Sequence, residues 1–152
     1  MRRCWSAWAC SAALVGAAGC GAARQAPPAV PAAWQANARQ VVQQLRVDIA
    51  TAAVGGTTAD DAAKALRDTS DLYALLVAYS DLGGCRQMVS SAAPPARIAR
   101  VLVPVCRHLE HASALFARAT QRSDPAALVL ATHEIDLAQP ALVRAMLAIR
   151  NG

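Results

Sequence analysis

The residues best suited to chemistry in this chain are its histidines, because imidazole binds metals and transfers protons near neutral pH. His108 and His111 are three residues apart in the segment RHLEH. This spacing puts both side chains on one side of a helix. Helical bundles hold metal ions with such pairs when a facing helix adds further ligands. His133 and Glu134 form a second polar pair further along the chain.

These side chains are not expected to converge. At about 100° per residue, His108 falls on the flank of the apolar stripe of its helix and His111 falls closer to solvent. Glu110 points elsewhere, and His133 and Glu134 lie outside the apolar stripe of their own helix. A closed or catalytic metal site needs three or four ligands. We therefore expect partly exposed histidines, with no metal and no cofactor.

Catalytic patterns are also missing from the sequence. No serine occurs in a nucleophile-elbow pattern, and the acidic residues are dispersed on polar faces. Glu134 and Asp136 are two residues apart and diverge on a helix. We therefore expect a protein without enzymatic activity.

The first nineteen residues are typical of a secretory signal. Met1-Arg2-Arg3 is a short basic start, and no charge follows until after Gly19. The apolar stretch is about sixteen residues long, shorter than the ~20 residues of a membrane-spanning helix. We expect residues 1–19 to be removed as a signal peptide.

The segment Ala17-Ala18-Gly19-Cys20 resembles the lipobox of bacterial lipoproteins, with Ala17 as a tolerated variant and Leu14 upstream of the usual leucine position. The resemblance covers residues 1–20. It implies a diacylglyceryl group on Cys20, cleavage before this residue, palmitate-type acylation and anchoring at the extracytoplasmic face of the cell membrane. An ordinary cleaved signal and an uncleaved signal anchor are the alternatives.

Residues 20–33 are expected to form a lipidated cysteine and a stalk, ahead of a domain at 34–152. Pro27, Pro28 and Pro31 oppose a helix and favour an extended segment. At ~3.1 Å per residue the segment spans up to ~40 Å. A plain disordered leader is the alternative.

The five cysteines are an odd number, which processing would resolve. Cys4 and Cys10 would leave with the signal and Cys20 would be acylated, so that Cys85 and Cys106 remain. We predict that these two form a disulfide, which would stabilise the fold by ~3 kcal/mol. Buried free thiols are the alternative; a redox pair is disfavoured because such pairs usually occur as CxxC.

Composition and periodicity predict an all-α domain. Hydrophobic residues make up 55% of the chain and aromatic residues only 4%, with alanine prominent, which favours closely packed helices. Helices are expected at about 34–54 and 58–82, from Pro94-Pro95 through Ala119, and from Asp124-Pro125 to the end. Residues 85–94 should be short and irregular, with room for one helical turn.

Apolar residues at spacings of three and four draw one stripe along each expected helix. The stripes are Trp34, Ala38, Val41, Val42, Leu45, Ile49 and Ala52; Ala62, Leu66, Thr69, Tyr73, Leu76, Val77 and Ser80; Ile98, Leu102, Val105, Leu109, Ala112, Phe116 and Ala119; and Leu128, Ala131, Thr132, Ile135, Gln139, Leu142, Met146 and Ile149. Short connections predict an up-and-down four-helix bundle. Pro104 should kink the third helix or else divide it into two, and Pro140 should kink the fourth helix.

The formal charge of +5 falls to +3 without Arg2 and Arg3. The remaining basic residues are scattered among acids, for example Arg46 near Asp48. We expect a mixed-charge surface that does not bind nucleic acid.

These observations favour a non-catalytic structural or protein-interaction module of the cell envelope, with an envelope protein as a partner. The alternative is a carrier for a small hydrophobic or lipid-like ligand, held in a cavity that kinked helices would leave between them.

Overall fold

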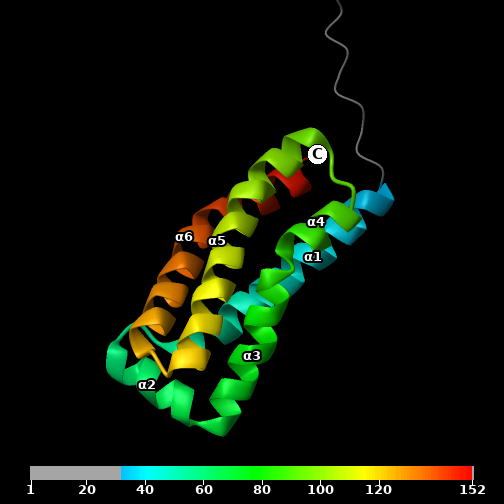
Figure 1. Ribbon diagram of the computed structural model, residues 1–152. Coiled ribbons are helices and arrows are strands. Elements are labelled where there is room, and N and C mark those ends of the chain that lie inside the picture. The colour runs from blue at the N-terminus through cyan, green and yellow to red at the C-terminus, as the bar shows by residue number, and fades with distance from the viewer. Residues whose placement is uncertain (1–31, 152) are drawn as a thin grey trace, which may run out of the picture.

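The computed structural model describes residues 32–151, and within this range the chain is helical without strands (Figure 1). The helices are α1 (Ala32–Ala52), extended by the 3-10 helix η1 (Ala53–Gly55), α2 (Ala59–Arg67), α3 (Thr69–Gly83), α4 (Cys85–Ser91), α5 (Ala96–Arg122) and α6 (Pro125–Arg150). The predicted all-α class is confirmed. The expected signal peptide, Cys20 and the stalk up to residue 31 lie outside the described residues, whereas Ala32 and Ala33, expected at the end of the stalk, are the first residues of α1.

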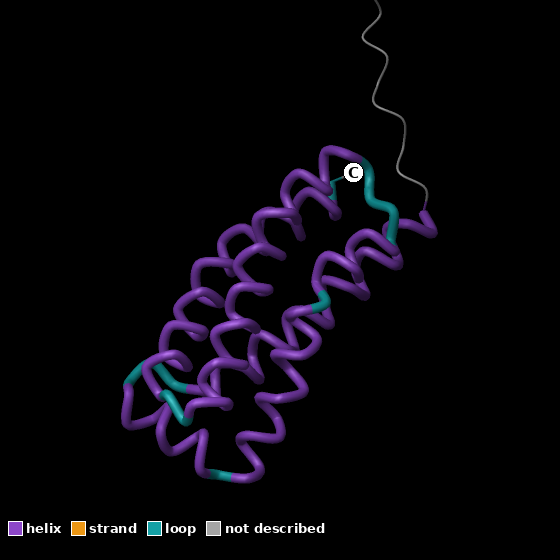
Figure 2. The backbone as a smooth tube through the Cα atoms, viewed as in Figure 1, coloured by secondary structure: helices purple, strands orange, loops and turns teal. Residues whose placement is uncertain are grey.

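The helices pack around one core. α5 and α6 form an antiparallel hairpin, α3 packs on α5, and α1 packs on both α3 and α6. α1 and α5 begin, and α4 and α6 end, at the same end of the molecule, which we call the proximal end (Figure 1). The loop between α4 and α5 also lies there, whereas α2 and the turn between α5 and α6 lie at the opposite, distal end (Figure 2).

Side chains that accept backbone N–H bonds start three of the helices. Thr58 accepts from Asp61 N at the start of α2, and Asp124 accepts from Ala127 N at the start of α6. Asp68 accepts from Ser70 N and Asp71 N. Its own backbone is extended, with φ −78° and ψ 120°, so α2 ends and α3 begins there. The expected single helix at 58–82 is therefore two helices.

This break also corrects the stripe expected for the second helix. Tyr73, Leu76 and Val77 are exposed, whereas Leu75 and Tyr79 are buried on the core side of α3. The periodicity that starts at Ala62 does not continue past the cap at Asp68, because the new helix starts with a different rotation.

The other stripes agree more closely with the core. All seven residues expected in the third stripe are buried, and Phe116 stacks on Tyr79 with ring centroids 4.4 Å apart. Burial raises the pKa of Tyr79 to about 12. In α6, Gln139 is exposed and Ala138 is buried instead.

Two local expectations differ from the structure. Residues Cys85–Ser91 form the helix α4, which is more than the single turn expected there. α5 continues through Pro104 and α6 through Pro140, so neither proline divides its helix.

Candidate functional site

A groove of about 590 Å³ lies between α1 and α6 towards the proximal end. Much of its lining is apolar: Val42 and Ile149 are buried, while Val143 and Leu147 are 55% and 44% exposed. Small-molecule sites commonly have this size and an apolar lining with a few polar groups. The groove is therefore suited to a hydrophobic molecule.

Three arginines line the same groove. Arg39 and Arg46 belong to α1 and Arg150 to the last turn of α6, and all three side chains are exposed. Among residues 32–151, none of the three forms a salt bridge. A guanidinium is always charged and presents a planar fork of donors that matches carboxylates and phosphates. The groove thus combines an apolar lining with unpaired positive charge.

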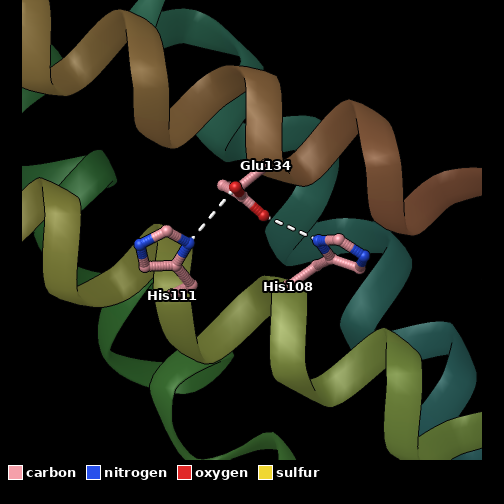
Figure 3. A network of polar contacts seen from close by, with 3 residues as sticks. All are labelled: His108, His111 and Glu134. Carbon is pink, nitrogen blue, oxygen red and sulfur yellow. Dashed lines mark hydrogen bonds and ion pairs between the residues drawn. The ribbon is translucent and has the colours of Figure 1, made fainter.

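The second polar feature is a carboxylate that bridges two imidazoles. His108 and His111 on α5 both point toward Glu134 on α6 (Figure 3). The distance from His108 Nδ1 to Glu134 Oε2 is 2.6 Å, and that from His111 Nδ1 to Oε1 is 3.2 Å. An ionised carboxylate can only accept, so Nδ1 of each ring must carry a hydrogen.

The three residues of this bridge differ in burial. The side chains of Glu134, His108 and His111 are 19%, 35% and 59% exposed. The hydrogen bond from His108 lowers the pKa of Glu134, burial partly opposes this shift, and the interaction with His111 lowers the pKa further. The bridge therefore favours the ionised form of Glu134 and ties α5 to α6.

The geometry of the bridge differs from that of a metal centre. The two rings approach different oxygens of one carboxylate, and their Nδ1 atoms face Glu134. Within residues 32–151, no group of three or more His, Cys, Asp and Glu side chains is arranged to hold a metal ion. The arrangement acts chemically as a polar clamp between two helices.

Sequence reasoning placed the histidines correctly but missed their partner. His108 lies on the flank of the core and His111 closer to solvent, as expected. Glu110 instead pairs with Arg86, at 2.9 Å. The signal that could have identified Glu134 is the helical hairpin: His111 lies twelve residues before Ser123 and Glu134 eleven residues after it.

The predicted disulfide is confirmed. Cys85, the first residue of α4, is bonded to Cys106 of α5, and both residues are buried. The bond ties α4 to the α5 segment that also carries His108. Neither sulfur is a free thiol, so neither can act as a nucleophile in this oxidised state.

One acidic side chain is buried in α1. Asp48 is 4% exposed, its Oδ1 accepts from Gln44 Nε2 at 3.0 Å, and its Oδ2 has no hydrogen-bond partner in the described part of the chain. Burial raises the pKa of Asp48, the bond from Gln44 opposes the shift, and the charge of Asp81 adds to it. Asp48 therefore opposes folding when it is ionised.

Comparison with known proteins leaves the groove and the bridge to be interpreted from their own geometry. No protein-family model matches the chain, and neither a curated protein nor a solved structure matches it. No helix between residues 32 and 151 is both long enough and apolar enough to span a bilayer.

Proposed function

We propose that this chain is a lipid-anchored protein of the extracytoplasmic face of the cell membrane. We further propose that its helical domain is a non-catalytic binding module that holds a small hydrophobic or lipid-like ligand in the groove between α1 and α6. The observation that carries the ligand proposal is the groove itself, with Val143 and Leu147 exposed within it. The anchoring proposal is supported by the resemblance of residues 1–20 to lipoprotein precursors.

We also propose that α1, α3, α5 and α6 act as an up-and-down four-helix bundle that α2 and α4 complete. The contacts between α1 and α3, α3 and α5, α5 and α6, and α6 and α1 support this arrangement. Pro104 and Pro140 each remove one backbone hydrogen bond, which favours a kink. Pro140 lies three residues before Val143, so a kink there would set the width of the groove.

Binding of the neutral fluorescent probe N-phenyl-1-naphthylamine tests the ligand proposal. The double variant Val143→Gln/Leu147→Gln removes apolar surface from the groove and should weaken probe binding about tenfold. Leu130→Gln/Leu137→Gln is a matched control, because these leucines lie on the same helix and are similarly exposed, at 53% and 46%, but do not line the groove.

Equal probe affinity in the two double variants would contradict binding in the groove. Native mass spectrometry of protein purified from its host adds an independent readout, in which a small molecule should be retained by the control and lost by the groove variant.

The anchor has its own test, the intact mass of protein extracted from membranes. We expect a polypeptide that begins at Cys20 and carries the added mass of acyl chains, and we expect Cys20→Ser to abolish that mass. An unmodified amino terminus at Cys20 would indicate simple secretion instead.

A second candidate function, a structural or protein-interaction module of the envelope, is favoured by one observation. Tyr73, Leu76 and Val77 form an exposed apolar face on α3, with Tyr73 70% exposed. The test is recovery of an envelope protein by the wild type and by the groove variant, but not by Tyr73→Ser/Leu76→Ser. Recovery by all three proteins would contradict an interface on α3.

A further inference from the structure

The proximal part of the domain contains basic residues and no acidic ones. We define it as the adjoining parts of α1, α5 and α6 with the loop before α5, residues 32–47, 92–109 and 137–151, which include neither Asp nor Glu; α4 is counted with the rest of the domain. Its seven arginines give it a formal charge of +7: Arg39, Arg46, Arg97, Arg100, Arg107, Arg144 and Arg150.

The rest of the domain has the opposite character. Residues 48–91 and 110–136 contain all ten Asp and Glu residues of the chain and five basic residues, a formal charge of −5. The mixed-charge surface expected from the sequence is therefore wrong for the proximal part. The fold gathers three acid-free segments from distant parts of the chain, because α1 and α5 begin where α6 ends (Figure 1).

The proximal arginines are available to a partner. All seven are exposed, and the salt bridges within residues 32–151 involve none of them. Two of the basic residues elsewhere do form ion pairs, Arg86 with Glu110 and Arg118 with Asp124. The groove with its exposed Val143 and Leu147 lies among the proximal arginines.

We propose that the proximal end docks on the surface of a membrane that contains anionic phospholipids. The arginines would contact lipid phosphates, and Val143 and Leu147 would face the boundary between headgroups and acyl chains. A lipid surface presents the phosphates and the headgroup–acyl boundary together. Each basic residue near an anionic lipid surface adds to binding. The groove would then open toward the lipid from which a hydrophobic ligand is taken, a step that rests on the proposed function.

Two observations favour a membrane over other anionic partners. A nucleic acid offers phosphates but no apolar layer for Val143 and Leu147. In addition, α1 begins at the proximal end, so the segment that follows Cys20 joins the domain there. That segment cannot itself neutralise the arginines, because residues 21–31 contain Arg24 and no acid.

A lipid tether and a basic surface would act together. Membrane attachment is durable when a second signal, such as a polybasic patch, supplements an acyl chain. With residues 21–31 as the stalk, which span about 34 Å at ~3.1 Å per residue, the domain stays close to the bilayer that holds the anchor. Docking turns a domain that could swing freely into one with a fixed orientation.

Vesicle binding by residues 20–152 with Cys20→Ser separates this proposal from lipid anchoring. All described helices and the disulfide lie within this range, and circular dichroism with thiol labelling checks that the protein is folded and oxidised. The probes are vesicles of phosphatidylcholine alone and vesicles with 30% phosphatidylglycerol. We expect binding only to the anionic vesicles, with an affinity that falls as salt screens the charges.

Two triple variants with the same net charge locate the surface. Arg97→Gln/Arg144→Gln/Arg150→Gln should weaken binding about 100-fold at low ionic strength. The matched control, Lys64→Gln/Arg67→Gln/Arg122→Gln, removes three positive charges from α2 and from the distal end of α5 and should bind like the wild type.

Three outcomes would overturn the docking proposal. They are equal losses in the two triple variants, equal binding to neutral and anionic vesicles, and arginine-dependent binding to a DNA duplex without binding to vesicles. None of these outcomes bears on acylation of Cys20 or on the neutral probe in the groove, which are measured separately.

Discussion

The groove between α1 and α6 and the bridge between α5 and α6 use charge in opposite ways. In the bridge, Glu134 pairs with His108 and His111, and all three residues belong to the same chain. At the groove, Arg39 and Arg150 have no acidic partner within the described residues. Charges that a protein pairs internally hold its helices together, whereas charges left unpaired beside an apolar surface are available to a ligand. Changes to the internally paired region should therefore affect stability, and changes at the proximal end should affect binding.

The largest stability effect should come from the disulfide, which lies two residues from His108 in α5. Cys85→Ala/Cys106→Ala should lower the free energy of unfolding by about 3 kcal/mol, because the unfolded chain loses a cross-link across twenty-one residues. Urea unfolding at pH 7 measures the loss. Vesicle binding by the folded fraction should be unchanged. A parallel loss of vesicle binding would contradict the expectation that the internally paired region affects stability and the proximal end affects binding.

Replacement of Asp48 should increase the stability of the fold, because the charge of Asp48 is buried without a full set of partners. Asp48→Asn should raise the free energy of unfolding by about 1 kcal/mol at pH 7. A raised pKa in the folded state means that the wild type gains stability as the pH falls through that pKa, so the advantage of the variant should vanish in acid. Thermal unfolding from pH 7 to pH 3 checks this, with the exposed Asp136→Asn as a control expected to change little.

The bridge itself should contribute less to stability than the disulfide, because its histidines are partly exposed. Glu134→Gln should lower the free energy of unfolding by up to ~1 kcal/mol at pH 6. Glu134 has a lowered pKa, so its contribution is present above the unfolded-state pKa and is lost as the pH falls through the folded-state value. The difference between wild type and variant should therefore shrink toward pH 2.

Glu110→Gln is the matched control for the bridge. Glu110 pairs with Arg86, whose side chain is 61% exposed, so this variant should lose less stability than Glu134→Gln. A larger loss in Glu110→Gln would contradict the clamp assigned to Glu134.

The smallest stability effect is expected at the proximal end. Arg144→Gln/Arg150→Gln should change the free energy of unfolding by less than about 0.5 kcal/mol, because neither side chain forms a salt bridge within residues 32–151. Urea unfolding checks this result alongside the vesicle assay. A loss as large as that of Glu134→Gln would show that these arginines are part of the fold.

The sequence predicted the features that depend on local spacing. The third stripe, the helix starts near residues 58 and 124 and the pairing of Cys85 with Cys106 are all confirmed, because periodicity, helix-start signals and a count of cysteines suffice for them. The break at Asp68 was missed although its signal is local, since an Asp that precedes Thr69-Ser70-Asp71 is a strong cap.

Features that depend on tertiary pairing could not be predicted from local spacing in the sequence. Glu134 reaches His108 only through the register of the α5–α6 hairpin, and a helical wheel of either helix alone does not show it. The positive charge at the proximal end arises from three segments, and Arg97 and Arg150 are fifty-three residues apart in the chain. Charge scanned along the sequence shows acid-free stretches, but only the topology brings them to one end.

The most direct test of the central claim is the depth of the proximal end in a bilayer. In a Trp34→Phe background of residues 20–152 with Cys20→Ser, a single tryptophan is introduced at the proximal end as Leu147→Trp or on α3 as Tyr73→Trp. Vesicles with 30% phosphatidylglycerol and brominated acyl chains then quench a tryptophan that approaches the lipid. We predict strong quenching for Leu147→Trp and little for Tyr73→Trp; equal quenching, or stronger quenching on α3, would contradict docking through the proximal end.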